Sequence, residues 1–330
     1  MSVRSIVGLA VSILLLAWFL YSLDVGAMAA TIRGANYALV IPAIAVYFFG
    51  VWLRAARWRM LVAPFAHVST GRLFQAILIG FAVNNVLPLR LGELVRTYLL
   101  HRSHDVSIPS ALATILLERL LDVVVLCAIM TVVLVMVPLD GWVLALASFA
   151  SLVTAAAVAG LLVLVLLPRR LLHRLFELGV GLADRLGRRV GSLARACIEG
   201  LRALEDARSV LAVGALSIGC WVAELGLYYC MMVAVGFNSG ILSLGAGMVV
   251  ANLATALPSS PGYIGTFDVP LQRLLTETFG VTEAAAGSYT VLTHAVLLIP
   301  VVVVGLLLLS REDLSFKSLT RGRVESRSAA

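Results

Sequence analysis

The chain has 330 residues, of which 61% are apolar and only 13% are charged, and its formal net charge is +7. Soluble domains are about half apolar and a quarter charged, so this composition excludes a soluble protein. Apolar runs of about twenty residues are typical of a polytopic helical membrane protein. Every basic residue except Lys317 is an arginine. The arginines concentrate between the apolar runs, as the positive-inside bias and anionic headgroups require, so we expect no nucleic-acid partner.

Six apolar runs are predicted to cross the membrane as helices. The first, residues 5–23, is longer than the apolar part of a signal peptide and no clean cleavage site follows it, so we expect a retained span. The others are residues 37–53, 110–137, 142–167, 209–235 and 283–309. The second run ends at Arg54, Arg57 and Arg59, and the last is followed by a basic tail, residues 311–330. Because basic clusters stay in the cytoplasm, both termini are expected there.

The connection over residues 168–208 carries nine arginines against five acidic residues, which also indicates the cytoplasm. Its leucines recur at intervals of three and four, which predicts amphipathic helices lying on the inner leaflet. A helical hairpin that packs on itself is the alternative. The connection joins two halves, roughly residues 1–167 and 209–310, of a single membrane domain over residues 1–310.

Two further apolar segments are interrupted. The first, residues 72–102, stops at Asn84, Asn85 and Pro88, and the second, residues 242–279, stops at Pro258. Backbone at membrane depth that is not helical must be buried in protein or line a wet cavity, since unpaired amides in hydrocarbon are costly. We therefore expect two re-entrant helical hairpins. The topology above makes them enter from opposite faces of the membrane.

Both interruptions contain Leu-Pro-x-x-x-Gly. The sequence has Pro88 with Gly92 in the first break and Pro258 with Gly262, and Pro261 between them, in the second. Corresponding breaks in two halves of opposite orientation indicate an inverted repeat with a substrate site near the bilayer midplane. Two ordinary kinked helices are the alternative.

Ionisable residues lie inside the run 110–137. Glu118 and Asp122 are four residues apart and share a helix face, about 12 Å and about 18 Å along the helix from its start, and Arg119 follows Glu118. Each charge costs at least ~2.5–3.5 kcal/mol at the centre of a membrane helix. These groups should therefore face the protein interior or water.

The first broken segment supplies the expected partners. Arg90 and Arg96 are predicted to lie opposite the acids of the run 110–137, and Glu93 opposite Arg119. Opposite charges at membrane depth pair with one another or line substrate pathways. The alternative is a buried salt-bridge network that only fixes helix packing.

The second half contributes its own polar residues. Glu224 lies deep in the run 209–235 and is expected to be protonated or paired with Arg273 or His294. Asp268 and Arg273 are five residues apart, which favours partners on other helices. Asn252 precedes the second break, as Asn85 precedes the first.

Half-helix N-termini and arginine forks both present N–H donors to oxyanions, so this site is suited to phosphate. An amphiphile with a phosphate head fits a polar cleft beside lipid, and free inorganic ions are the alternative. With no nucleotide-binding motif, active transport would use a proton or lipid gradient, with Glu224 or Asp122 as the proton carrier.

No motif indicates catalysis. The sequence contains no GxSxG, P-loop or GxGxxG in a suitable context, and the histidines and the four cysteines show no metal-ligand spacing. We therefore expect neither an enzyme nor a bound metal or cofactor.

Three ordered motifs resemble a known family. They are NNVLPLRLGELVRTYLL at residues 84–100, LLERLLD at 116–122 and LPSSPGYIGTFD at 257–268. They resemble the transmembrane region of lysylphosphatidylglycerol synthase and its stand-alone relatives, the flippase-like UPF0104 group. The resemblance implies a lipid translocase module without the aminoacyl-transferase domain. It also adds Gly265 to the residues of the second break.

The sequence thus predicts an all-α polytopic protein with six full transmembrane helices and two re-entrant hairpins of opposite orientation. We expect it in a bacterial or archaeal cytoplasmic membrane, moving or presenting an anionic phospholipid or a polyprenyl-phosphate-linked lipid. The alternatives are a non-catalytic partner of a lipid-modifying glycosyltransferase or aminoacyltransferase, and an enzyme that acts on lipid phosphates. A homo-oligomer is compatible with the sequence. The predicted polar cleft contains Asn85, Arg90, Glu93, Arg96, Glu118, Arg119, Asp122, Glu224, Asn252, Asp268 and Arg273.

Overall fold

The computed structural model describes residues 25–87, 91–166, 174, 177–182, 188–201, 207–256 and 261–312. Within these residues the chain is all-helical, with no strand. The longer helices are α2 (Val25–Gly34), α3 (Val40–Val62), α4 (Thr70–Val86), α5 (Gly92–His104), α6 (Ile108–Met136), α7 (Gly141–Leu166), α9 (Arg188–Leu201), α10 (Ala207–Val235), α11 (Ile241–Ala254), α12 (Asp268–Arg273) and α13 (Glu283–Arg311). Short helical turns cover Tyr37–Leu39, Pro261–Tyr263 and Leu274–Thr278.

Five helices are long and apolar enough to cross a membrane. They are Tyr37–Val62, Ile108–Met136, Gly141–Gly160, Arg208–Val235 and Glu283–Arg311. These helices correspond to five of the six predicted spans, and the remaining one, residues 5–23, lies outside the described residues. The protein is therefore a multi-pass membrane protein.

The helix α3 continues past residue 53, where the sequence analysis ended the second span. Arg54 and Arg57 consequently lie inside the helix with only 6% and 0% of their surface exposed, whereas Arg59 is exposed. The expectation that the second span ends before Arg54 is therefore wrong. The two arginines lie on the buried face of α3 with Val51 and Trp58, at helical spacing, and acidic residues on other helices neutralise them.

The first broken segment is a tight pair of helices, α4 and α5. Gly92 begins α5 and donates its backbone N–H to the Oδ1 atom of Asn84 at 2.7 Å. A Cβ atom at Gly92 would overlap the carbonyl oxygen of Gly80 on α4, so only glycine allows this approach. Pro88 and Arg90, between the two helices in the sequence, lie outside the described residues.

The second broken segment contains α11 and α12, and a helical turn, Pro261–Tyr263, precedes α12. Pro261 begins this turn, and Gly262, Tyr263 and Gly265 have positive φ angles of 71°, 56° and 84°. Glycine adopts this left-handed backbone without strain, which explains why two glycines lie here. Pro258 lies outside the described residues.

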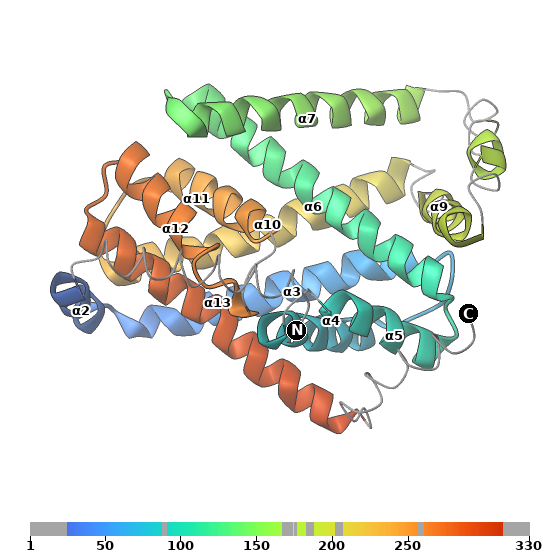
Figure 1. Cartoon of the computed structure of the whole chain (residues 1–330), viewed down its shortest axis with the longest axis horizontal. Coiled ribbons are helices and arrows are strands. Elements are labelled where there is room, and N and C mark those ends of the chain that lie inside the picture. The colour runs from blue at the N-terminus through green and yellow to red at the C-terminus, as the bar shows by residue number, and fades with distance from the viewer. Residues whose placement is uncertain are drawn as a thin grey trace.

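Figure 1 shows that the two broken segments lie toward opposite ends of the molecule, α11 and α12 at one end and α4 and α5 at the other. The helix α13 crosses between them and packs against α4, where Gly305 fits closely against the backbone of Leu78. Small residues commonly permit such close approach between membrane helices.

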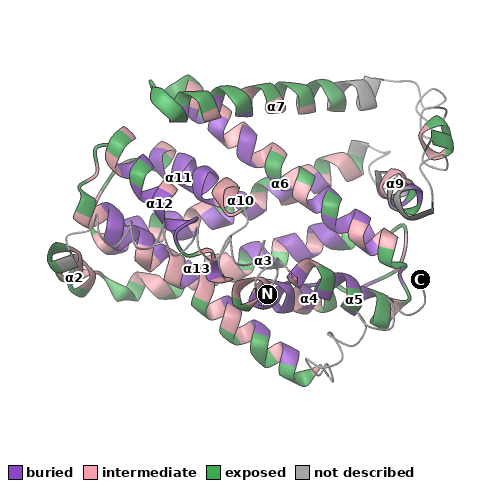
Figure 2. Cartoon of the chain, viewed as in Figure 1, coloured by how far each residue is buried: buried purple, intermediate pink, exposed green. Residues whose placement is uncertain are grey.

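The helices α6 and α7 diverge from a shared turn, and most of the surface of α7 is exposed (Figures 1 and 2). Its exposed side chains include Phe149 and Leu152. An apolar outer face of this kind is suited to contact with lipid acyl chains.

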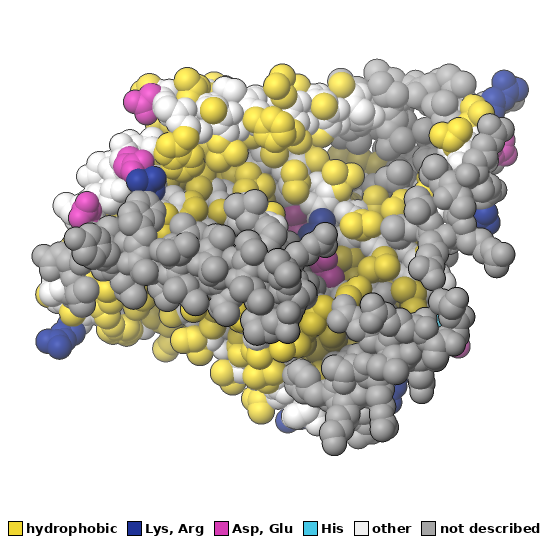
Figure 3. All heavy atoms as spheres, in the orientation of Figure 1, with side chains coloured by type: hydrophobic (Ala, Val, Ile, Leu, Met, Phe, Trp, Pro, Cys, Tyr) yellow, Lys and Arg dark blue, Asp and Glu magenta, His cyan; other side chains and the backbone are white. Residues whose placement is uncertain are grey.

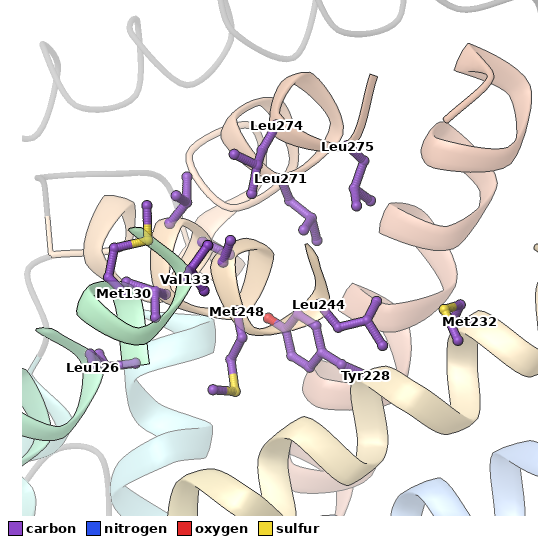
Figure 4. Close-up of a cluster of buried hydrophobic side chains, with 14 of the residues drawn as sticks. Leu126, Met130, Val133, Tyr228, Met232, Leu244, Met248, Leu271, Leu274 and Leu275 are labelled. Carbon is purple, nitrogen blue, oxygen red and sulfur yellow. The ribbon is translucent and has the colours of Figure 1, made fainter. Parts of the chain in front are cut away.

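The apolar core that supports the site lies among α6, α10, α11 and α12. Figure 4 shows Met130 of α6, Tyr228 of α10, Met248 of α11 and Leu271 of α12 in this cluster, and all four side chains are fully buried. The packing fixes the second half of the molecule against α6.

The helix α9 packs on protein. Gly200 lies against Leu117 of α6, and Ile198 lies against Gly179 of the preceding helical piece. Part of α9 is therefore covered by the chain itself. Contact of this connection with the inner leaflet stays a prediction.

Candidate functional site

A cluster of charged side chains lies in the interior of the helix bundle. We call it the central network, and it consists of Arg54 and Arg57 of α3, Arg96 of α5, Glu118, Arg119 and Asp122 of α6, and Glu224 of α10. All of these residues except Arg119 are buried, and 37% of the Arg119 side chain is exposed. Four helices thus contribute to one set of ion pairs.

Asp122 is the acceptor at one end of the network. Its carboxylate lies 2.9 Å from Arg57, 3.2 Å from Arg54 and 3.7 Å from Arg119. Arg54 also donates to the Oε2 atom of Glu224 at 3.1 Å, so one guanidinium joins α6 to α10. The ring of Trp221 lies 4.6 Å from this guanidinium and covers it.

Glu118 is the acceptor at the other end. It accepts two hydrogen bonds from Arg96, at 2.8 and 3.1 Å, and one from Arg119 at 2.9 Å. The Arg96 guanidinium stacks on Trp58 at 4.1 Å, and Trp58 in turn donates to Thr114 at 3.0 Å. This two-point geometry is the strong form of an arginine–carboxylate pair.

The network has more positive than negative charge and more donors than acceptors. Four arginines face three carboxylates, and the Nε atoms of Arg57, Arg96 and Arg119 have no hydrogen-bond partner among the described residues. Buried donors without partners are costly, so they favour an additional acceptor such as water or an anion.

A cavity of about 180 Å³ opens beside the network. Both broken segments supply its walls, with Asn84 and Asn85 from the end of α4, Asn252 from α11, and Tyr263 and Phe267 from the second turn. The remaining lining residues are Tyr47, Arg54, Phe81, Glu93, Arg96, Arg119, Trp221, Glu224, Thr255, His294, Leu297 and Leu298. The helix α4 packs against the turn Pro261–Tyr263 of the second segment, and a Cβ atom at Gly262 would lie 3.8 Å from the carbonyl oxygen of Asn85 near the end of α4.

The predicted cleft residues fall into four groups. Asn85, Glu93, Arg96, Arg119, Glu224 and Asn252 line the cavity, while Glu118, Asp122 and Asp268 lie behind this lining. Arg273 lies elsewhere, half exposed and 3.3 Å from Glu277 in the same segment. Arg90 lies outside the described residues.

The observed partners of the charged cleft residues agree only partly with the partners predicted from the sequence. Arg96 pairs with Glu118, as predicted. Glu224, however, contacts Arg54 and accepts a 2.8 Å hydrogen bond from Asn252, so the expected partners Arg273 and His294 are wrong. The sequence analysis did not include Arg54 in the polar cleft, because Arg54 stands among arginines at the end of an apolar run. The sequence signal that could have placed it there is its helical spacing from Val51 and Trp58, with which it shares the buried face of a helix that continues to residue 62.

His294 of α13 binds the second break instead. Its Nδ1 atom lies 2.7 Å from the Oδ1 atom of Asp268, and its Nε2 atom lies 2.7 Å from the carbonyl oxygen of Gly262. The other carboxylate oxygen of Asp268 accepts from the backbone N–H of Gly265 at 2.8 Å. Asp268 thus has its partner on another helix, as expected.

Figure 3 shows acidic and basic side chains together near the middle of the view, and most of the described side chains around them are hydrophobic. Charge surrounded by apolar surface, halfway along the molecule, is unusual in a membrane protein and marks a functional region by default.

These features define a multi-pass helical membrane protein with a polar cavity between two interrupted helical segments. The chain belongs to the family described as "Lysylphosphatidylglycerol synthase TM region", which it matches over residues 5–305. The resemblance seen in the three motifs is therefore confirmed.

Two curated relatives are similar over most of this chain. "Glycosyltransferase AglD" of Haloferax volcanii is 26% identical over 89% of this chain and 52% of its own length, so the chain spans about half of that relative. "UPF0104 membrane protein" of Methanothermobacter thermautotrophicus is 26% identical over 87% of this chain and 89% of its own length. No solved structure matches the chain significantly.

Proposed function

We propose that this protein is a lipid translocase that moves an anionic phospholipid, or a polyprenyl-phosphate-linked lipid, between the leaflets of a prokaryotic cytoplasmic membrane. The observation that supports this most strongly is the cavity between the two breaks, because arginines from three different helices, Arg54, Arg96 and Arg119, line it. A polar site in that position serves a charged headgroup while the acyl chains stay in lipid.

The proposed topology has six full spans and two re-entrant hairpins, with both termini in the cytoplasm. Two observations support it. The broken segments lie toward opposite ends of the molecule (Figure 1), and α4 of the first packs against the turn Pro261–Tyr263 of the second. Hairpins that enter from opposite faces and meet midway would give each leaflet a route to the same site, which is the geometry of alternating access.

Arg119 is the first residue we expect a headgroup phosphate to contact. Its side chain is the most exposed of the central network, and its two terminal nitrogens already hold Glu118 and Asp122. A phosphate oxygen can therefore share this guanidinium without leaving either acid unpaired. The amides of Asn84, Asn85 and Asn252 add neutral donors around the same space.

The volume of the cavity fits a headgroup with its water. At about 180 Å³ it holds on the order of ten water-sized spheres. We propose that these waters and the phosphate exchange as the lipid passes, and that no bond of the lipid is broken.

The experiment is a leaflet-exchange assay with purified protein in vesicles of phosphatidylglycerol and phosphatidylethanolamine that contain a fluorescent phosphatidylglycerol. We expect faster loss of inner-leaflet fluorophore with wild-type protein than with the Arg119→Gln variant. Arg72→Gln, which removes a charge at the exposed end of α4, is the matched control and should transport as wild type. Exchange no faster than in protein-free vesicles would contradict the proposal, and lipid breakdown products would indicate an enzyme.

A second candidate function is that of a non-catalytic membrane partner for a lipid-modifying transferase. The similarity to about half of a relative named as a glycosyltransferase favours it, because the other half of that relative has no counterpart in the match. This candidate predicts no leaflet exchange in pure vesicles, but faster product formation when a glycosyltransferase or aminoacyltransferase is added to them.

A further inference from the structure

The walls of the cavity carry hydrogen-bond acceptors as well as donors. Asn85, Asn252 and Glu93 line it together with Arg119 and other arginines. The oxygens of a phosphate diester can only accept hydrogen bonds, so a bound phosphate pairs with arginine N–H groups and gives nothing to an acceptor. The proposed phosphate contact therefore leaves the acceptors on these walls without a role.

The amide groups of Asn85, near the end of α4, and Asn252, on α11, are held in the same way. The Nδ2 atom of Asn85 donates to the carbonyl oxygen of Phe81, four residues earlier, at 2.9 Å. The Nδ2 atom of Asn252 donates to the carbonyl oxygen of Met248, also four residues earlier, at 2.9 Å, and to Glu224 at 2.8 Å. Because a backbone carbonyl oxygen can only accept, the NH₂ group of each amide must face it. The orientation of both amides is thereby fixed.

The side-chain oxygens of the same two amides have no donor. Among the described residues, neither the Oδ1 atom of Asn85 nor that of Asn252 accepts a hydrogen bond. Both residues are only partly buried, and neither oxygen belongs to the enclosed atoms without a partner, so both oxygens are open to a ligand. Asn84 differs, because its Oδ1 atom already accepts from Gly92 at 2.7 Å. Each broken segment thus offers one unpaired amide oxygen at the cavity.

Glu93, in the first turn of α5, is a third unpaired acceptor. Its side chain is half-buried, and its carboxylate makes no ion pair or hydrogen bond among the described residues. Glu118, Asp122 and Glu224, by contrast, each contact at least one arginine. A partly buried carboxylate without a partner is costly, so it favours a hydrogen-bond donor supplied from the cavity.

We propose that Asn85, Asn252 and Glu93 form an acceptor subsite, which selects lipids whose headgroup carries hydrogen-bond donors beyond its phosphate. Such donors are hydroxyl or ammonium groups on the alcohol that is esterified to the phosphate. This inference rests on the proposed translocase function. The arginines hold the phosphate, and the acceptor subsite holds the alcohol portion of the same headgroup.

The two parts of this headgroup site are adjacent. Glu224 accepts a hydrogen bond from Asn252 and also pairs with Arg54, so one carboxylate joins the acceptor subsite to the arginines. All three residues line the same cavity of about 180 Å³. A single small headgroup can therefore contact both parts at once.

Selection follows from the cost of an unmade hydrogen bond. A site that binds donor groups disfavours an analogue that lacks them, because its acceptors then lose water without gaining a partner. Phosphatidylethanol is such an analogue of phosphatidylglycerol, with the same charge and an ethyl group in place of glycerol. If water alone satisfied Asn85, Asn252 and Glu93, the two lipids would bind equally well.

The first test measures binding and is independent of transport. Short-chain phosphatidylglycerol and phosphatidylethanol are titrated by calorimetry into the purified protein in detergent micelles. We expect wild type to bind phosphatidylglycerol about tenfold more tightly. Asn85→Ala, and Glu93→Met, which keeps the side-chain length without an acceptor, should reduce this ratio, while Asn238→Ala at an exposed loop position should keep it. Equal affinities in wild type, binding of neither lipid, or an unchanged ratio in both cavity variants would overturn the proposal.

A second pair of lipids in the same titration identifies the kind of donor. Phosphatidylethanolamine and phosphatidylcholine are both zwitterionic, but only the first has N–H groups. Tighter binding of phosphatidylethanolamine assigns ammonium as well as hydroxyl groups to the subsite, whereas equal binding restricts the subsite to hydroxyl groups. Tighter binding of phosphatidylcholine would contradict the subsite.

The second test uses the leaflet-exchange assay with the fluorophore on an acyl chain, so that each headgroup stays intact. Wild type should move phosphatidylglycerol about tenfold faster than phosphatidylethanol, and Asn85→Ala should narrow the difference. Equal rates in wild type overturn the selection but leave translocation standing. Exchange of neither lipid contradicts translocation, and the titration then decides the subsite alone.

Discussion

Arg96 on α5 and Glu118 on α6 form a two-point ion pair in which two guanidinium nitrogens lie 3.1 and 2.8 Å from the two carboxylate oxygens. Both residues are almost completely buried, at 1% and 0% exposed. The pair connects the first broken segment to a membrane-crossing helix. Removing Glu118 leaves the buried Arg96 guanidinium without its carboxylate, and removing Arg96 leaves Glu118 with Arg119 as its remaining partner. Breaking a buried pair in this way is more costly than the pair itself is stabilising.

We therefore predict that Glu118→Gln and Arg96→Gln each lower the free energy of unfolding by about 3–5 kcal/mol. The double variant should lose less than the sum, because neither charge is then left alone. Unfolding followed in detergent micelles measures this. Arg72→Gln, which breaks an exposed pair with Glu312 at 3.8 Å, should cost no more than about 1 kcal/mol. Additive losses would show that Arg96 and Glu118 are not coupled.

A second prediction concerns the contact between α4 and α5. Gly92→Ala introduces a methyl group where the carbonyl oxygen of Gly80 lies, so the helices must separate. We expect a loss of about 1–3 kcal/mol in stability, typical of overpacking, and a lower yield of folded protein. Gly71→Ala is the control, since nothing lies within 4 Å of the added carbon. Equal yields of the two variants would exclude this close approach.

A third prediction tests the orientation of the two hairpins. In a variant without native cysteines, single cysteines at the exposed positions His67 and Asn238 report the ends next to the first and second broken segments. We expect an impermeant maleimide added to intact cells to label the residue-238 cysteine, and the residue-67 cysteine to react only after the membrane is opened. Labelling of both from one side would contradict entry from opposite faces.

A fourth prediction concerns lipid selectivity. If Arg119 contacts the headgroup phosphate, its replacement by glutamine removes a charge-assisted hydrogen bond of about 1.5–3 kcal/mol. Exchange of phosphatidylglycerol should then slow by about tenfold or more. Competition between phosphatidylglycerol and phosphatidylcholine in the same vesicles measures the preference. An unchanged preference in Arg119→Gln would place headgroup selection elsewhere.

The sequence alone was sufficient for part of this architecture. The apolar runs identified five described membrane helices, and the cost of charge in a membrane indicated that Glu118 and Asp122 face inward. The pair between Arg96 and Glu118 could be anticipated because charges in neighbouring elements, 22 residues apart, have few other partners at that depth.

The rest depended on contacts between distant parts of the chain. Arg54 pairs with Asp122 and Glu224, which are 68 and 170 residues away, and no local pattern connects them. Its arginine neighbours suggested the cytoplasmic edge, and only the three-dimensional course of α3 shows that it faces inward. The contact of His294 with the carbonyl of Gly262 is equally inaccessible, because the sequence does not reveal the direction of a backbone oxygen in a turn.

The central claim is that a lipid headgroup enters the cavity between the two breaks. The most direct measurement is crosslinking in vesicles with a phosphatidylglycerol that carries a photoreactive group on its headgroup, followed by mass spectrometry of the labelled peptides. The account predicts labelling near Asn85 and Asn252, which line the cavity, and loss of that labelling in Arg119→Gln. Labelling confined to the exposed outer face of α7, around Phe149 and Leu152, would contradict it.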